Sequence, residues 1–225
     1  MTLEDAQVPT RPRRGRAPKR AAIMTAARVV FGREGYMRTS IDAIAGEASV
    51  STRTIYNHFE SKEQLFGVVL ETSATQVAET FLETLRRELP PGPPTPGRLE
   101  ADLVVIGRAL VRQSREHPEH FAMIRQISAE AAHFPPAMLL AWREAGPLRV
   151  RREVADRLRE FADRGLLTVA DPFRAAAHLV ALTSAELGLQ STPWGDPADE
   201  PKLDESIAAA VRAFLNGYAA GGSAE

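Results

Sequence analysis

The chain has 225 residues, of which 44% are hydrophobic and 25% are charged, and its formal net charge is −1. This is the balance of an ordinary globular protein that is long enough to bury a core. It contains no cysteine, which excludes disulfides and thiolate chemistry, and no apolar run near the roughly 20 residues that a membrane-spanning helix needs. Without a signal-peptide pattern at the N-terminus, a cytoplasmic protein is expected.

The charge is distributed unevenly along the chain. Between Arg11 and His58 there are 10 Lys and Arg residues and only three acids, whereas from Phe59 onward there are 18 basic and 24 acidic residues. A basic segment joined to an acidic remainder is typical of a protein that carries a surface for a polyanion. A solvated basic tail would give the same counts, so charge alone leaves both interpretations open.

The first elements are an arm and a helix. Residues 1–17 are rich in Pro, Arg and Gly and have no apolar period, which predicts a disordered basic arm. A helical pattern follows, with Gly35 placed to end it, and its apolar positions recur at the spacing of one helix face: Ile23, Ala27, Val30 and Phe31.

Two short helices with a tight turn come next. Thr39 or Ser40 is placed to cap a helix over Ile41–Glu47, and Ser51 is placed to cap a second helix that runs to about His58. Small side chains at Ala45 and Ala48 allow the two helices to cross closely, as in a helix-turn-helix. The second helix then exposes groups that hydrogen-bond base edges and phosphates: Thr52, Arg53, Thr54, Tyr56, Asn57 and His58.

The neighbouring segments extend this predicted DNA-binding region, which we place at residues 18–64. Ser61 and Gln64 form a capping box that opens a long helix, and Lys62 adds a positive charge to its N-terminus, a favourable place for a phosphate. In the basic arm, Arg14 and Arg16 are candidates for the minor groove. The alternative interpretation is that the arm is only a solubilising tail.

The remainder, residues 65–220, is predicted to be helical throughout. The proline-rich segment Leu89–Gly97 is a loop, because proline removes amide donors and fixes φ. The predicted fold class is therefore all-α. The chain is expected to consist of an N-terminal three-helix helix-turn-helix domain and a C-terminal helical domain for ligand binding and dimerisation. Its later helices are expected at about Leu99–Glu116, Pro118–Phe134, Pro136–Arg164 with a kink at Gly146-Pro147, Asp171–Leu189 and Leu203–Tyr218.

Residues 20–68 resemble the DNA-binding domain of the TetR (tetracycline-repressor) family. The resemblance rests on Phe31–Tyr36, Thr39-Ser40, Ile44-Ala45, Ser49–Ser51, Ile55–Phe59 and Lys62–Leu65. It implies DNA contacts at Ser40, Thr52, Arg53, Thr54, Tyr56, Asn57, His58 and Lys62. One departure is Ser49, which stands where the family usually has glycine; if φ is positive there, serine is strained by about 1 kcal/mol.

The C-terminal region is similar to the AefR-like subgroup, and this similarity names no ligand. A mixture of large apolar and polar side chains in the middle helices is what a small-molecule site requires. The candidate ligand-binding residues, each of which could instead be plain core, are His117, Phe121, Ile124, Arg125, Phe134, Met138, Trp142 and His178. The pairs His117/His120 and Glu130/His133 have a spacing that could hold a metal, but two ligands do not make a site, and we expect no metal and no cofactor.

The predicted function is therefore a ligand-responsive transcriptional regulator, a repressor by family behaviour, that binds double-stranded operator DNA at a palindrome and is released by a small-molecule effector. An enzyme and a passive DNA-coating protein are the alternatives, and no phosphate loop or nucleophile elbow supports the enzyme. A homodimer through the last two helices is expected, although both of their apolar stripes could instead bury within the same chain. The stripes are Phe173, Ala177, Val180 and Ala181, then Ile207, Val211, Phe214, Leu215 and Tyr218.

Overall fold

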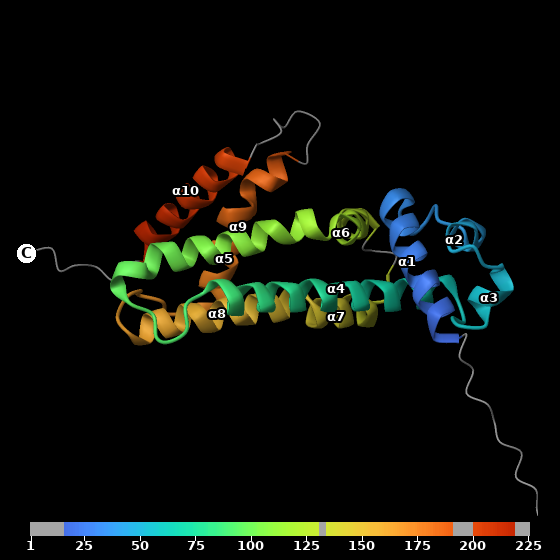
Figure 1. The fold of residues 1–225 in the computed structure, drawn as a ribbon, viewed down its shortest axis with the longest axis horizontal. Coiled ribbons are helices and arrows are strands. Elements are labelled where there is room, and N and C mark those ends of the chain that lie inside the picture. The colour runs from blue at the N-terminus through green and yellow to red at the C-terminus, as the bar shows by residue number, and fades with distance from the viewer. Residues whose placement is uncertain (1–15, 131–133, 191–199, 219–225) are drawn as a thin grey trace, which may run out of the picture.

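The computed structural model describes residues 16–130, 134–190 and 200–218, which form an elongated assembly of helices (Figure 1). No β-strand occurs in these ranges, and the prediction of an all-α chain with an N-terminal helix-turn-helix region and a helical C-terminal domain is confirmed. The elements are α1 Arg16–Glu34, α2 Ile41–Glu47, α3 Thr52–Tyr56, α4 Lys62–Glu88, a 3₁₀ turn η1 Pro96–Arg98, α5 Leu99–Glu116, α6 Pro118–Glu130, α7 Pro136–Ala145, α8 Pro147–Asp163, α9 Pro172–Gln190 and α10 Glu200–Tyr218.

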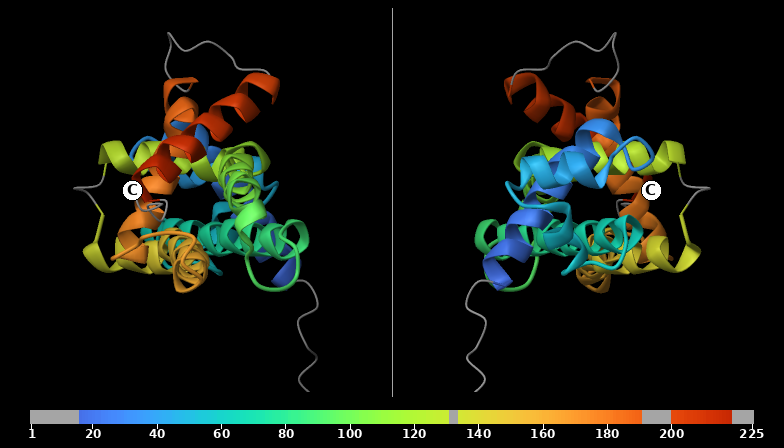
Figure 2. Two further views of the ribbon diagram at one scale, coloured as in Figure 1. Left: turned by 90° about the vertical axis from the view of Figure 1, so that its left-hand side faces the viewer. Right: turned by 90° about the vertical axis from the view of Figure 1, so that its right-hand side faces the viewer.

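Helices α1–α3 form one end of the molecule, which faces the viewer in the right-hand panel of Figure 2. Helix α1 begins at Arg16, so it includes the last two residues of the predicted disordered arm, 16 and 17. Arg14 and the rest of the arm lie outside the described residues, as does the side chain of Arg16. The boundary placed between residues 17 and 18 therefore does not coincide with the start of the helix.

The short helices of this end are capped by the serines that the sequence indicated. The side chains of Ser40, Ser51 and Ser61 accept hydrogen bonds from the amides of Ala43, Thr54 and Gln64, respectively. In the predicted capping box, the Gln64 side chain reaches back to the amide of Glu60, with an N–O distance of 2.7 Å. These bonds satisfy amides that a helix leaves without partners, which is why helices as short as α2 and α3 are stable here.

The turn between α2 and α3 depends on one strained residue. Ser49 has φ of 52°, and it is the only residue other than glycine with positive φ among those described. In this conformation the amides of Ser49 and Val50 reach the carbonyls of Gly46 and Ala45 at 3.1 and 3.0 Å and close the helix end. The condition named in the sequence analysis, a positive φ at Ser49, is therefore met, and serine carries the strain that glycine would avoid.

Helix α4 belongs to two hydrophobic cores. Its first turns, with Leu65, Phe66 and Val69, pack against α1, α2 and α3, whereas Phe81 and Leu85 pack among α5, α8, α9 and α10. In Figure 1 it runs along much of the molecule, with α5 and α6 on one side and α7 and α8 on the other. The predicted division between residues 64 and 65 thus falls inside the first turn of a helix that both halves share.

Part of the C-terminal region completes the N-terminal core. Met123 and Ile127 of α6, together with Phe134, are buried against residues of α1 and α4. The Phe134 ring lies 5.1 Å from that of Phe66 and 5.2 Å from that of Tyr36, measured between centroids. Helix α6 is described as far as Glu130; residues 131–133, which precede the predicted end near Phe134, lie outside the described residues.

The segment predicted as one kinked helix, Pro136–Arg164, is two helices, α7 and α8. Gly146 separates them with φ of −127° and ψ of −82°, and Pro147, which lacks an amide proton, starts α8. A Cβ atom at Gly146 would lie 2.8 Å from the Cβ of Ala74 in α4. Glycine at this position therefore permits the close approach of the α7–α8 junction to α4.

The apolar stripe of α10 faces the chain's own core, which corrects the expectation that this stripe forms the dimer interface. Ile207, Val211 and Phe214 are at most 2% exposed and pack against α5 and other helices of the same chain. At Gly107 of α5, an added Cβ would lie 2.8 Å from Ile207 and 3.0 Å from Thr183, so glycine allows α9 and α10 to approach α5 closely. The outer face of α10 carries small or polar residues instead.

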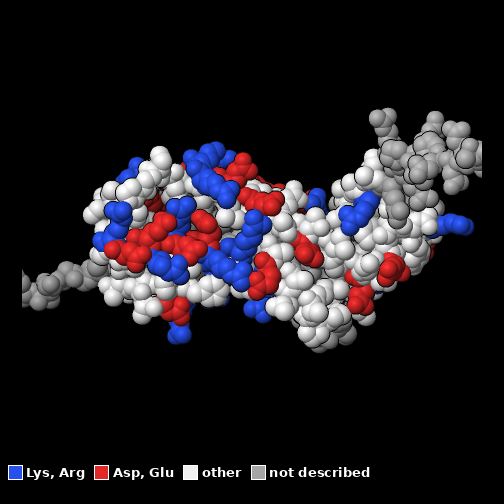
Figure 3. All heavy atoms as spheres, turned by 90° about the horizontal axis from the view of Figure 1, so that it is seen from below, with Lys and Arg blue, Asp and Glu red and all other residues white. Residues whose placement is uncertain are grey.

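The surface of α8 is solvated by charges of both signs (Figure 3). Arg157 pairs with Glu153 and Glu160, and Arg152 pairs with Glu144. Such exposed pairs contribute little to stability, and their mixture of signs gives α8 no single-sign patch.

No helix in the three described ranges combines the length and the apolar character needed to cross a bilayer.

Replacing Ser49 by glycine should stabilise the protein. We expect the free energy of unfolding of Ser49→Gly to rise by about 0.5–1 kcal/mol, because glycine adopts positive φ without a Cβ penalty. Urea denaturation at a fixed protein concentration measures this. Ser49→Ala is the matched control, since it keeps the Cβ and should bring no gain; equal stability of the wild type and the glycine variant would contradict the assigned strain.

Candidate DNA-binding surface and effector cavity

Helix α3 is anchored on one side and open on the other. Ile55 is 1% exposed, and Phe59, just beyond the helix, is 2% exposed, so these two side chains fix α3 on the N-terminal core. On the opposite side Arg53, Tyr56 and Asn57 are exposed. Tyr56 is 55% exposed, so its ring is accessible on this side of α3.

The other side chains predicted to contact DNA around α3 also make contacts within the protein. The hydroxyl of Thr54 lies 2.9 Å from that of Ser51, which is also the helix cap, and Thr52 is half-buried. His58 is half-buried beside Phe59, with a centroid distance of 6.4 Å. Ser40 is exposed and caps α2. Any contact of these side chains with DNA stays a prediction, whereas the outward position of Arg53, Tyr56 and Asn57 is what a groove-reading helix needs.

Lys62 has a role that sequence reasoning missed. Its Nζ donates to the carbonyl oxygens of Tyr36 and Thr39 at 2.9 and 3.0 Å, and it lies 4.5 Å from the centroid of the Tyr36 ring. The ammonium group therefore ties the α1–α2 loop to the start of α4 and is not simply a free charge at a helix N-terminus. The contact of Lys62 with a phosphate stays a prediction, and the ammonium group would have to make it in addition to these two hydrogen bonds.

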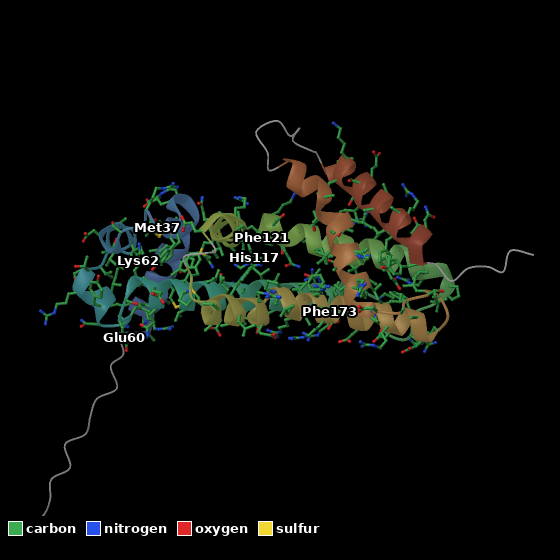
Figure 4. The ribbon with its side chains drawn as sticks, turned by 180° about the vertical axis from the view of Figure 1, so that it is seen from behind. Met37, Glu60, Lys62, His117, Phe121 and Phe173 are labelled. Atoms are coloured by element: carbon green, nitrogen blue, oxygen red, sulfur yellow. The ribbon has the colours of Figure 1, made fainter. Side chains whose placement is uncertain are left out.

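Two exposed residues of the α1–α2 loop were not among the predicted contacts. Met37 is 55% exposed and Arg38 is also exposed, and Figure 4 places Met37 close to Lys62. The signal that could have found them is their place in the sequence, in the loop just before the capped α2. A cation and an apolar side chain here extend the surface of α3 along the same end of the molecule.

A cavity of about 450 Å³ lies in the middle of the molecule, and α4–α9 all contribute to its wall. Most of the wall is apolar, with Val77 of α4, Leu110 of α5 and Val150 of α8 as examples, and Phe121 and Trp142 add aromatic rings. A volume of this size and an apolar wall with a few polar groups are typical of a site for a small organic molecule.

Three of the eight predicted ligand-binding residues line this cavity: Phe121, Ile124 and Trp142. The other five lie elsewhere. Phe134 and Met138 pack with the N-terminal core, Arg125 is exposed, and His178 is bonded to the hydroxyl of Tyr218 at 2.6 Å. His117 stands at the α5–α6 junction near Phe121 (Figure 4) but does not line the cavity; burial lowers its pKa. Spacing along one helix could not separate residues that face the cavity from residues that face a neighbouring core.

The polar residues of the wall include two that the sequence analysis did not propose as ligand contacts, Gln113 of α5 and His120 of α6. The space itself comes from small side chains on facing helices: Ala74 and Ala78 of α4, and Ala177 and Ala181 of α9. This spacing of alanines on two helices is the signal that could have located the cavity, since small residues that face each other leave room.

His120 is buried and uncharged. It is 5% exposed, and its Nδ1 lies 2.9 Å from the hydroxyl oxygen of Ser73, which donates its proton to the carbonyl of Leu70 at 3.0 Å. With the Ser73 proton directed at Leu70, the Ser73 oxygen accepts from His120; this arrangement puts the imidazole proton on Nδ1 and leaves the lone pair on Nε2. Burial, with smaller contributions from His117 and Arg28, lowers the pKa of His120 to about 4.

Two buried donors on the wall have no partner among the described residues. These are Nε2 of Gln113 and Nε1 of Trp142, each with almost no exposed surface. Buried N–H groups are nearly always hydrogen-bonded in folded proteins, so two exceptions on one cavity wall indicate a place for an acceptor group. Arg151 also reaches the wall, but its Nε donates to the carbonyl of Phe173 and its guanidinium stacks 3.9 Å from the centroid of the Phe173 ring.

The pair of His117, at the C-cap of α5, and His120 of α6 shows no arrangement for a metal. No group of three or more His, Asp or Glu side chains that could hold an ion occurs within the described ranges. His133, the other candidate, lies outside them. Because Nδ1 of His120 is bonded to Ser73, this ring has at most one nitrogen to offer any ligand.

Removing the ammonium group of Lys62 should destabilise the DNA-binding end of the molecule. Lys62→Met leaves two carbonyl oxygens without their donor, and we expect the free energy of unfolding to fall by about 1–3 kcal/mol and DNA affinity to fall with it. Urea denaturation and mobility shifts measure the two effects. Lys19→Met, which removes an exposed lysine of α1, should leave stability unchanged; a Lys62→Met variant as stable as the wild type would refute the role of Lys62 in holding the loop.

Comparisons with known proteins agree with both halves of this arrangement. Residues 23–69 match the family described as bacterial regulatory proteins, tetR family, and residues 101–220 match the AefR-like transcriptional repressor C-terminal domain. The transcriptional regulator UidR of Escherichia coli K12 is 26% identical over 148 residues, which cover 66% of this chain and 68% of UidR.

Two solved structures extend the similarity to nearly the whole chain. A TetR-family protein from Mesorhizobium loti MAFF303099 has a TM-score of 0.76 and 29% identity, covering 91% of this chain and 98% of the other. The flavonoid-responsive regulator FrrA has a TM-score of 0.66 and 29% identity, covering 90% and 98%. Members of this family are DNA-binding transcription regulators that form dimers and respond to small molecules. The chain belongs to the TetR family of transcriptional regulators, with an AefR-like C-terminal domain.

Proposed function

We propose that this protein is a ligand-responsive repressor that binds a palindromic operator as a homodimer and releases it when a small molecule occupies the cavity. The observation that carries the proposal is the course of α4. Its middle, at Ala74, Val77 and Ala78, lines the cavity, while its first turns form the core that holds α1–α3. A ligand that favours another position of α4 thereby changes the placement of the DNA-reading helix.

The geometry of α3 supports a dimer. This helix has only five residues and offers three outward side chains, Arg53, Tyr56 and Asn57, which are too few to select a rare site. Two copies related by a two-fold axis would read two half-sites, so the operator should be a palindrome. Arg14 and Arg16, if they reach the minor groove beside each half-site, would add affinity with little sequence selection.

The outer face of α9 and α10 is our candidate for the dimer interface. On α9, Leu182 is 39% exposed. On α10, Ala209 and Ala213 are exposed on the side opposite the buried stripe. Small side chains allow helices from two chains to approach closely, and two helices from each chain would form a four-helix interface. The proposal thus keeps α9 and α10 but replaces the inward-facing stripe with this outer face.

The effector is proposed to bind in the central cavity. FrrA, whose fold is similar over 90% of this chain, is by its name responsive to a flavonoid, a polycyclic aromatic compound. The apolar wall with Phe121 and Trp142 is compatible with an aromatic molecule. Such a regulator would act in the cytoplasm, where bacterial operator DNA lies, and it would carry out no chemistry on its ligand.

Selection from random double-stranded DNA with the full-length protein tests this function. We expect enrichment of a single palindromic sequence that binds one dimer at two half-sites. A passive DNA-coating protein would enrich no sequence, and a site without a repeat would contradict the proposed dimeric reading.

The dimer can be separated from folding with a matched pair of variants. Leu182→Arg puts a charge on the proposed interface and should yield a folded monomer with at least tenfold weaker operator affinity. Arg174→Ala, on an exposed turn of the same helix, should leave mass and affinity unchanged. Light scattering gives the mass; a Leu182→Arg protein that stays dimeric would show that the interface lies elsewhere.

A further inference from the structure

The chemistry of the cavity wall narrows the class of effector. Besides Arg151 and Ser184, three side chains bring hydrogen-bonding groups to a wall that is otherwise mostly apolar: Gln113, His120 and Trp142. They come from α5, α6 and α7, so their convergence depends on the tertiary structure and not on a sequence motif. What each can accept or donate is fixed by its surroundings.

His120 presents an acceptor. Its Nδ1–H is used by Ser73, and in the part of the chain that the structure describes no hydrogen bond is made by Nε2. An imidazole that stays neutral because it is buried, with its pKa lowered to about 4, keeps the Nε2 lone pair available at physiological pH. A ligand group that meets Nε2 must therefore carry a proton to donate.

Trp142 and Gln113 present donors. The indole N–H can only donate, and Nε2 of Gln113 is an amide donor; both are buried and lack protein partners in the described ranges. An oxygen atom with lone pairs would satisfy them. A hydroxyl group can both donate to His120 and accept from such N–H groups, whereas an ether or a hydrocarbon cannot do both.

The wall does not suit a charged molecule. Among the described residues that line the cavity there is no Asp or Glu to pair with a cation. The only cation among these same residues is Arg151, whose Nε donates to the carbonyl of Phe173 and whose guanidinium stacks on the Phe173 ring. A carboxylate would also set its lone pairs against the lone pair of the neutral His120, which is unfavourable in a buried site.

We propose that the effector is an uncharged hydroxyaromatic molecule whose hydroxyl group donates to Nε2 of His120 and whose oxygen accepts from Nε1 of Trp142 or Nε2 of Gln113. The inference rests on the proposed effector role of this cavity and adds the class of ligand. The aromatic body packs against the apolar wall that Phe121 and Val77 help to form.

Calorimetric titration of the full-length protein without DNA tests the class with four matched probes: 2-naphthol, 2-methoxynaphthalene, naphthalene and 2-naphthoate. We expect 2-naphthol to bind at least tenfold more tightly than each of the others, since only it is uncharged and both donates and accepts. Equal binding of 2-naphthol and 2-methoxynaphthalene, tightest binding of 2-naphthoate, or no binding of 2-naphthol would overturn the proposal.

Variants assign the contacts. Trp142→Phe and Gln113→Leu should weaken 2-naphthol binding, about tenfold for the one that contacts the oxygen, and the free protein should stay folded, because neither donor loses a hydrogen-bond partner among the described residues. His120→Phe should abolish the preference for 2-naphthol over 2-methoxynaphthalene. His117→Asn, at the start of α6 but off the cavity wall, is the control and should keep that preference. If Trp142→Phe, Gln113→Leu and His120→Phe all bind 2-naphthol as the wild type does, the hydroxyl does not lie at these groups.

Binding and DNA release are measured separately, so that the two proposals fail in different ways. If 2-naphthol binds with the expected preference but does not release the operator in mobility shifts, the ligand class stands and the effector role of the cavity fails. If only charged compounds, or compounds without a hydroxyl group, release the operator through this cavity, the effector role stands and the hydroxyaromatic class is wrong.

Discussion

The structure depends on α4 being one continuous helix that two hydrophobic cores share. Leu65 and Phe66 are buried in the core of the DNA-binding end, and Phe81 and Leu85 are buried in the core of the C-terminal helices. Neither end can move its part of α4 without moving the other, because interiors are close-packed and do not deform smoothly. The central cavity lies along the stretch between these cores, where the side chains of α4 are small.

Helix α6 supplies a second link between the cavity and the DNA-binding end. A Cβ atom at Gly32 of α1 would lie 3.2 Å from the carbonyl oxygen of Glu119 and 3.4 Å from the Cβ of Ala122, so the two helices nearly touch at this glycine. His120, on the cavity wall, stands between those two residues in the sequence of α6. A hydrogen bond that changes the position of His120 therefore acts one residue away from the contact with α1, while its bond to Ser73 acts on α4. Both links run from the cavity wall to the end of the molecule that α1–α3 form.

Much of the DNA-binding end could be predicted because its signals are local. The serine caps and the positive φ of Ser49 are properties of a few consecutive residues, and the structure has them. Long-range packing could not be predicted in this way. The stripe of α10 was correctly identified as apolar, but the sequence could not say that Ile207 and Phe214 meet their own chain, and nothing local places Phe134 against Phe66. Lys62 looked like a phosphate contact because the carbonyls that it binds are 23 and 26 residues away. The cavity was only partly found, since its volume depends on alanines from helices distant in sequence.

The claim that α4 makes the two cores one unit is tested most directly by native-state hydrogen exchange of the unliganded wild type. The slowest-exchanging amides of α1, near Val30, and of α8, near Val154, should exchange through openings that have the same free energy. The opening free energy should also decrease with urea concentration at the same rate in both helices. This result is expected because unfolding of either core must unwind part of the shared helix. Exchange of the most protected α1 amides through an opening several kcal/mol lower than that of the α8 amides, with α4 protection intact, would contradict the account.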